Sequence, residues 1–145
     1  MSAKGFTLIE LLVVMVLMGV ILAVVPMALF NVLPGVELKG AARDIAAGLR
    51  QARSLAVLGN RDVDFVVDIA ARDYAILGKG ESRALPERLE IQLETAQSDL
   101  SDDDVGVISF FPDGSSTGGR VTLGWEGREY HIMVDWLTGQ VSVVE

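Results

Sequence analysis

The pattern of hydrophobic and polar positions divides the 145-residue chain into three parts. In the first part the apolar residues show no periodicity, and Leu11–Phe30 contains 20 residues without a charge. A helix of about 20 apolar residues is long enough to cross ~30 Å of hydrocarbon. We therefore expect residues 6–30 to form a transmembrane helix. Pro26 removes one helical hydrogen bond, which favours a kink and packing among other helices.

In the second part, from about residue 36 to residue 58, apolar residues recur at steps of three and four. The positions on this stripe are Leu38, Ala42, Ile45, Leu49, Ala52 and Ala56, whereas Lys39, Arg43, Arg50 and Arg53 lie off it. The pattern predicts an amphipathic helix whose small alanines allow close contact with a sheet. Residues 31–35, which include Pro34, are expected to interrupt the helix where it leaves the membrane, and Gly59-Asn60 to end it.

In the third part, from residue 61 to the end, the period changes to two, which is typical of half-buried strands. About seven antiparallel strands are predicted, at 63–69, 74–77, 89–93, 105–111, 120–125, 128–134 and 141–144. The segments 78–86, 98–104 and 112–119 have the composition of loops and turns. The expected fold class is α+β, with one long N-terminal helix packed on antiparallel β-sheets.

One charge interrupts the apolar beginning of the chain. Glu10 lies about one helical turn from the start of the hydrophobic segment. An unpaired carboxylate inside a membrane costs several kcal/mol, so such a residue is a functional candidate by default. The alternative is a carboxylate that lies at the headgroups and is simply solvated. Lys4, before the apolar segment, favours a cytoplasmic N-terminus by the positive-inside rule.

Composition limits the chemistry of the remainder. All but one of the 20 acidic residues and all but one of the 12 basic residues lie beyond Pro34, so this part is clearly negative and should repel nucleic acid. The chain has no cysteine, which excludes disulfides and thiolate metal sites. His131 is the single histidine, and no Ser/His/Asp arrangement accompanies it. We therefore expect neither an enzyme, such as an exported one with a membrane anchor, nor a cofactor.

Two groups of residues have more than one interpretation. The acidic segment Asp99–Asp104 supplies oxygen ligands of the kind that Ca²⁺ prefers, through Asp99, Asp102, Asp103 and Asp104. It lacks the spacing of a calcium-binding loop, and acidic loops are usually solvated, so no metal is expected.

The aromatic residues Phe111, Trp125, Tyr130 and Trp136 are expected in the core, and the alternative is a contact surface for a neighbouring subunit.

The segment Gly5-Phe6-Thr7-Leu8-Ile9-Glu10, followed by an apolar helix, resembles the leader and N-terminus of type IV pilins and type II secretion pseudopilins. The resemblance implies that residues 1–5 are a prepilin leader peptide. It also implies that a prepilin peptidase cuts between Gly5 and Phe6 and methylates the new N-terminus at Phe6. Cleavage would create a positive α-amine within reach of Glu10, in the same subunit or in a neighbour. In low dielectric, this pairing would recover much of the burial penalty of the carboxylate.

The C-terminal part carries a second resemblance. Phe111-x-Asp113-Gly114 with its Ser/Thr/Gly-rich continuation to Gly119, and the later Thr138-Gly139, are similar to the pseudopilin H and FimT-like family. This implies a pilin-like periplasmic domain at 31–145 and a minor subunit of the type II secretion pseudopilus. Its partners would be other pseudopilins, and it would lie in the inner membrane as a single-pass protein.

The alternative is a FimT-like minor pilin of a type IV pilus, some of which bind DNA through arginines near the C-terminus. This chain ends Val141-Ser142-Val143-Val144-Glu145, without a basic cluster. Because contact with phosphate needs lysine or arginine, this departure favours the secretion branch.

Overall fold

A computed structural model of the chain describes residues 7–30, 33–95 and 104–145, with the side chains of 23–34 left out. The chain forms two units, Met1–Pro34 and Gly35–Glu145. The acidic segment 98–104 is outside the described residues except for Asp104, and so are Gly5 and Phe6.

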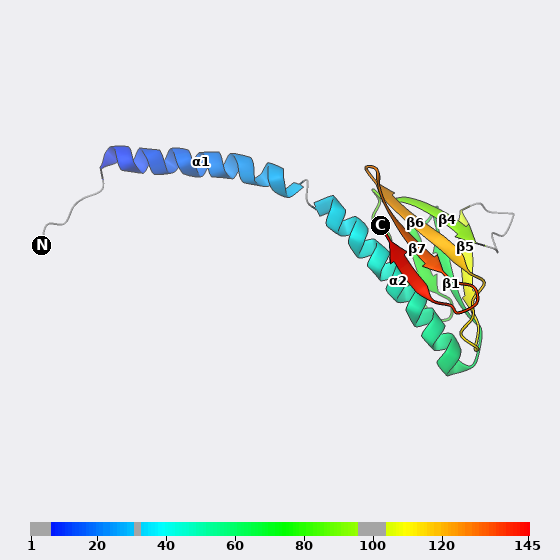
Figure 1. The fold of residues 1–145 in the computed structure, drawn as a ribbon. Coiled ribbons are helices and arrows are strands. Elements are labelled where there is room, and N and C mark those ends of the chain that lie inside the picture. Colours follow the sequence, from blue (N-terminus) through cyan, green and yellow to red (C-terminus); the bar gives the residue numbers. More distant parts are fainter. Residues whose placement is uncertain (1–6, 31–32, 96–103) are drawn as a thin grey trace, which may run out of the picture. The chain divides into compact units, whose positions relative to one another are not determined.

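The first unit contains helix α1, Leu8–Phe30 (Figure 1). This confirms a helix in the apolar segment, and the helix continues through Gly19 and Pro26. Among the described residues, no helix has both the length and the hydropathy of a membrane span. The transmembrane assignment of 6–30 remains a prediction.

Helix α2 spans Leu33–Gly59, and from Gly35 onward it belongs to the second unit. The helix starts earlier than the predicted position 36, because Pro34 lies in its first turn, where a missing N–H is tolerated. Every position of the predicted apolar stripe is completely buried. Asn60, in the left-handed conformation with φ 48°, follows the last turn and ends the helix.

Two four-stranded antiparallel sheets complete this unit, with the orders β3-β2-β1-β5 and β4-β6-β7-β8. The strands of the first sheet are β1 (Val63–Asp68), β2 (Asp73–Ile76), β3 (Ser82–Ala84) and β5 (Val105–Phe110). Those of the second are β4 (Glu90–Thr95), β6 (Gly119–Trp125), β7 (Arg128–Val134) and β8 (Val141–Val144). The α+β fold class is therefore confirmed.

The structure has one strand more than the predicted seven. Strand β3 lies in the segment 78–86, which was predicted to be a loop. Its three residues are all exposed and pair only with β2 at the sheet edge, so they show none of the alternation that identifies a half-buried strand.

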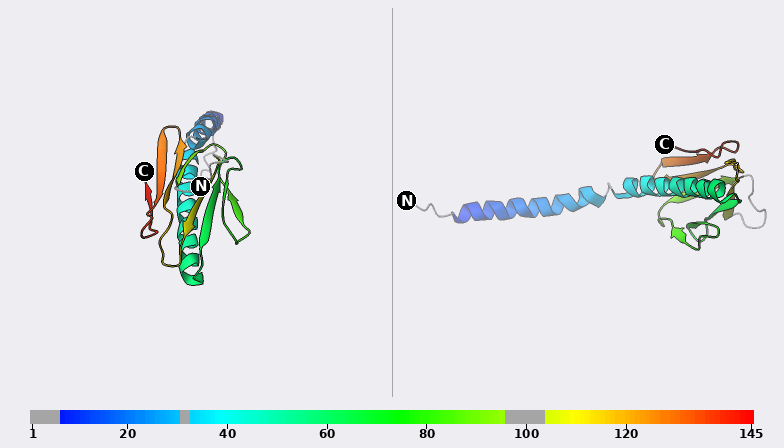
Figure 2. Two further views of the ribbon diagram at one scale, coloured as in Figure 1. Left: turned by 90° about the vertical axis from the view of Figure 1, so that its right-hand side faces the viewer. Right: turned by 90° about the horizontal axis from the view of Figure 1, so that it is seen from below.

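Helix α2 lies across both sheets, with β7 and β8 to one side of it and β1–β3 to the other (Figure 2). The largest completely buried side chains come from the helix and both sheets, and include Leu49, Phe65, Phe110, Leu123 and Ile132. Gly48 allows the closest approach of α2 to the first sheet, since a Cβ there would lie 2.8 Å from the Phe65 ring. The core thus joins one helix to two sheets.

The aromatic residues divide between core and surface. Tyr130 is buried, Trp125 is partly buried against the core and Phe111 is half-buried. The prediction is wrong for Trp136, which is 65% exposed because it lies in the turn between β7 and β8.

Candidate functional site

The first turn of α1 fixes the position of Glu10. The carbonyl oxygen of Thr7 accepts hydrogen bonds from the backbone N–H groups of Glu10, at 3.1 Å, and Leu11, at 3.3 Å. Thr7 therefore precedes the helix as its cap, and Glu10 projects from the first turn. A carboxylate at this end of a helix interacts favourably with the helix dipole.

Helix α1 presents apolar side chains on all of its faces. From Leu8 to Leu22 the large hydrophobic side chains are 50% exposed (Val13) to 84% exposed (Leu8). A helix that is apolar all round needs a covering of lipid or of other helices. Glu10 is the one ionisable side chain between Leu8 and Leu22, so any covering must accommodate a carboxylate.

A second group of candidate residues lies where two loops of the globular unit meet. The loop after β5 folds on itself, because Phe111 N–H donates to Ser115 O at 3.0 Å and Gly114 N–H donates to Phe111 O at 2.9 Å. The Ser116 N–H then donates to Trp136 O at 2.9 Å, which joins this loop to the β7–β8 turn. The two segments singled out by their composition, far apart in the chain, are therefore in contact.

Asp135 organises the β7–β8 turn. Its Oδ1 accepts hydrogen bonds from Thr138 N–H at 2.8 Å, Thr138 Oγ1 at 2.8 Å and Leu137 N–H at 3.1 Å. These bonds, chiefly those from Thr138, lower the pKa of Asp135 below its ordinary value. The fixed turn leaves Trp136 and Leu137 65% and 63% exposed, which makes a small apolar surface.

Arg53 of α2 holds both loops. Its Nε donates to the carbonyl oxygen of Gly114 at 3.1 Å, and Gly139 packs on the same side chain. Gly139 has φ 62°, and a Cβ at this position would overlap Gly114 O. In the sequence, Arg53 is recognisable only as a polar residue off the apolar stripe, because no local pattern reveals a contact with a distant loop.

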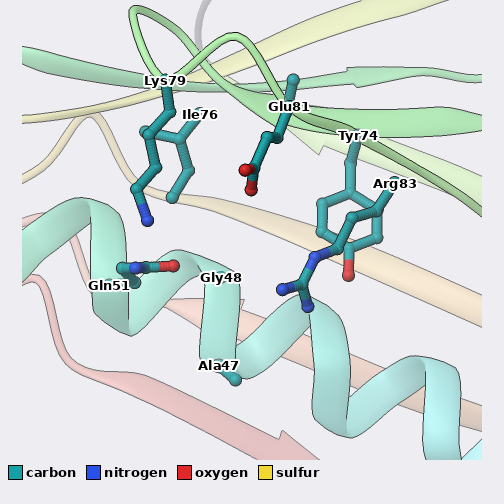
Figure 3. A pocket seen from close by; sticks show the side chains of 9 residues that line it. Ala47, Gly48, Gln51, Tyr74, Ile76, Lys79, Glu81 and Arg83 are labelled. Atoms are coloured by element: carbon teal, nitrogen blue, oxygen red, sulfur yellow. The ribbon is translucent and has the colours of Figure 1, made fainter.

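A cavity of about 190 Å³ lies between α2 and the β2–β3 edge. Figure 3 shows Glu81 between Lys79 and Arg83, with all three side chains directed toward α2. Burial raises the pKa of Tyr74 behind them, and Arg83 partly opposes that effect. Two cations and one carboxylate line this cavity, which holds no nucleophile paired with a base.

His131 and the acidic segment form neither a catalytic site nor a metal site within the described residues. His131 Nδ1 lies 3.0 Å from Thr122 Oγ1, and its Nε2 lies 3.7 Å from Glu129. No group of metal-ligating side chains occurs in residues 7–22, 35–95 and 104–145. Of the four aspartates considered for Ca²⁺, three are outside these ranges, and the Asp104 carbonyl accepts a hydrogen bond from Ile69 N–H at 2.6 Å.

Comparison with known proteins matches two families. Residues 41–138 match the family model of type II transport protein GspH. Residues 1–26 match the prokaryotic N-terminal methylation motif. Over 138 residues the chain is 34% identical to type II secretion system protein H of Xanthomonas campestris, covering 95% of this chain and 81% of that protein.

Solved structures show the same fold. The minor pseudopilin EpsH from the type II secretion system of Vibrio cholerae superposes with a TM-score of 0.58 at 15% identity, over 74% of this chain and 96% of that one. The type IV minor pilin FimU of Pseudomonas aeruginosa gives 0.56 at 16% identity, over 75% of this chain and 89% of that one. At these identities the likeness concerns the fold alone.

Proposed function

The chain belongs to the GspH family of type II transport proteins, and on this basis we propose that it is a minor pseudopilin of a type II secretion system. Its role is structural: it joins other pseudopilins in a short periplasmic filament and contributes to secretion across the outer membrane. Assembly rests on packing and charge pairing, and catalysis has no part in it.

The observation that carries the proposal is the combination of an all-round apolar α1 with a single carboxylate in its first turn. Lipid covers such a helix before assembly, and the helices of neighbouring subunits cover it in a filament. When the helix moves from lipid into a filament, it exchanges apolar contacts for others of a similar kind. The difference in free energy between the two environments must therefore come from polar pairing. Glu10 is placed to supply that pairing.

The partner of Glu10 is the α-amine that processing creates. Prepilin peptidase cleaves between Gly5 and Phe6, and Phe6 becomes the methylated first residue. The match of residues 1–26 to the N-terminal methylation motif supports this assignment. Before cleavage, the nitrogen of Phe6 is part of a peptide bond and carries no positive charge. After cleavage, the carboxylate pairs with its own amine or with that of the adjacent subunit, which admits only processed subunits to the filament.

The location of the chain in the cell follows from its apolar N-terminal segment. Residues 6–30 span the inner membrane once, with the N-terminus in the cytoplasm and residues 31–145 in the periplasm. The globular unit then determines which subunits this one contacts. Trp136 and Leu137 are suited to such a contact, because they are exposed, apolar and held on a fixed turn.

A type IV pilus subunit is the alternative, and the sequence comparisons do not favour it. Both the family model and the 34% identical relative concern type II secretion. The similarity to FimU concerns the fold alone. DNA binding is not expected of this acidic chain, and a gel shift with plain duplex DNA at low salt would reveal it.

The test is to identify the neighbours of the full-length chain in its own membrane. The chain is tagged at its C-terminus, cross-linked in cells, purified in detergent and analysed by mass spectrometry. We expect other pseudopilins of the secretion system among the cross-linked proteins. Recovery of type IV pilus subunits in their place would contradict the proposal, as would normal secretion by cells that lack the chain.

A further inference from the structure

The exposed part of α2 has two chemically different sides. Lys39, Arg43, Arg50 and Arg53 follow one another at steps of four, seven and three, so they lie on one side of the helix, which is called the basic flank below. Glu37 and Asp44 lie on the other side, next to Leu85 and Pro86. Four of the chain's 12 basic residues thus gather on one strip of a protein with net charge −8.

The basic flank faces the second sheet at β8. Two adjoining hollows separate them, of about 340 Å³ and 550 Å³, and Arg50 lines both. Tyr130 and Val143 contribute the apolar lining of the first, and Val141 lines the second. Together the hollows form a groove between a row of cations and the last strand, which is called the α2–β8 groove below.

Strand β8 is the edge of its sheet, because the described strands follow the order β4-β6-β7-β8. The register pairs Val134 with Val141 and Ile132 with Val143. Asp135 N–H donates to Gln140 O at 3.0 Å, which makes residues 135 and 140 a hydrogen-bonded pair. Hydrogen-bonded and non-hydrogen-bonded pairs alternate along an antiparallel ladder. The backbone groups of Val141 and Val143 therefore point away from β7, toward the groove.

A contact within the chain supports this orientation. Arg50 Nη2 donates to the carbonyl oxygen of Val141 at 3.2 Å, so one outward backbone group is already used by the basic flank. The N–H and C=O of Val143 lie two residues further along the same edge. Val143 itself is 36% exposed beside Tyr130 and so leaves room for a side chain from a partner.

We propose that the α2–β8 groove binds an extended acidic segment of another protein, which adds to the sheet as a strand beside β8. Such a strand would pair its backbone with Val143 and place carboxylates against Lys39 and Arg43. The proposal concerns the globular unit and goes beyond the filament role, which rests on α1.

The geometry favours a peptide over other anions. An open strand edge offers alternating N–H and C=O groups, which a peptide backbone complements and a phosphate does not. The net charge of −8 opposes nucleic acid and anionic lipid at longer range, whereas a short strand in the groove is close to the cations. DNA and anionic vesicles are therefore the competing ligands in the test.

The test uses the full-length chain in a neutral detergent and a labelled peptide of about ten residues that alternates threonine and glutamate. A threonine–glutamine peptide is the uncharged control. Fluorescence anisotropy at low salt measures binding, and hydrogen exchange measures protection of the Val143 amide. We expect binding of the glutamate peptide, slower exchange at Val143 and weakening by salt.

Two sets of variants locate the site. K39Q/R43Q should weaken binding about threefold to tenfold, whereas K79Q/R88Q, which removes the same charge away from the groove, should leave it unchanged. Glu145 lies beside Tyr130 at the end of β8, so E145Q removes a competing carboxylate and should strengthen binding. Misfolding would weaken binding, so it cannot explain a gain in affinity.

Several results would overturn the proposal. These are equal weakening by both double variants, binding without protection of Val143, no binding of the glutamate peptide, and preferential binding of duplex DNA or of phosphatidylglycerol vesicles. Cross-linking of α1 to other pseudopilins is measured separately, so failure of the groove and failure of the filament role are distinguishable.

Discussion

Arg53 Nε donates to the carbonyl oxygen of Gly114 at 3.1 Å, across a sequence separation of 61 residues. The bond fixes the loop after β5 to the amphipathic helix. Because the same side chain packs against Gly139, one residue positions both loops that carry the family resemblance. The loops are also held by their own hydrogen bonds, by the bond from Ser116 to Trp136 and by two bonds between Thr117 and Ser109 of β5.

Replacement of Arg53 by alanine should lower the free energy of unfolding by about 1–2 kcal/mol, because Gly114 O loses a charged donor that lies partly buried. Chemical denaturation of the full-length chain in detergent measures the change. Arg61→Ala removes an exposed arginine from the same protein and serves as control. Equal effects of the two substitutions would show that Arg53 does not hold the loops.

Gly139→Ala should destabilise the chain by more than about 1 kcal/mol. The left-handed φ of 62° is unfavourable for alanine, and the new Cβ would also overlap Gly114 O. Gly127→Ala is the matched control, since Gly127 has φ 80° and open space around its Cβ position. The difference between their melting temperatures isolates the steric contribution, and no difference would contradict the close approach of the two loops.

The hydrogen bonds to Asp135 predict a dependence of stability on pH. Its pKa is lower in the folded chain than in the unfolded one, so its contribution is complete above the ordinary value of 3.8 and is lost as pH falls through the lower, folded value. Thermal unfolding of Asp135→Asn, which cannot titrate, should change less between pH 6 and pH 3 than that of the unsubstituted chain. A change of equal size in both would rule out a contribution from Asp135.

Trp136→Ser should leave the stability within about 0.5 kcal/mol, because the indole is 65% exposed. In contrast, it should reduce cross-linking to other pseudopilins if the turn is a contact surface. Tyr130→Ser is the comparison, since Tyr130 is buried and its loss should unfold the chain more readily. Unchanged cross-linking of the Trp136 variant would remove this turn from the assembly surface.

The sequence was sufficient where the pattern is local. The stripe from Leu38 to Ala56 is predictable because a helical period is visible within a few turns, and every position on it is buried. Strand β1 is predictable because apolar residues there alternate chiefly with aspartates. Strand β3 was missed because an exposed strand of three residues has no such signal.

The relation between distant segments could not be predicted from the sequence. As an aromatic residue, Trp136 is expected in the core, but three hydrogen bonds to Asp135 hold its turn at the surface. The contact of Arg53 with Gly114 and the groove beside β8 depend on which segments the fold brings together. Neither has a spacing that can be recognised along the chain.

The central claim is that Glu10 admits the processed subunit to a filament through charge pairing. The most direct measurement is incorporation of Glu10→Gln, compared with Glu10→Asp, by cross-linking between α1 helices in membranes, with processing followed by mass. We predict that the Glu10→Gln variant inserts and is cleaved normally but is not incorporated into the filament, whereas the Glu10→Asp variant is incorporated in part. Normal incorporation of Glu10→Gln would contradict the account.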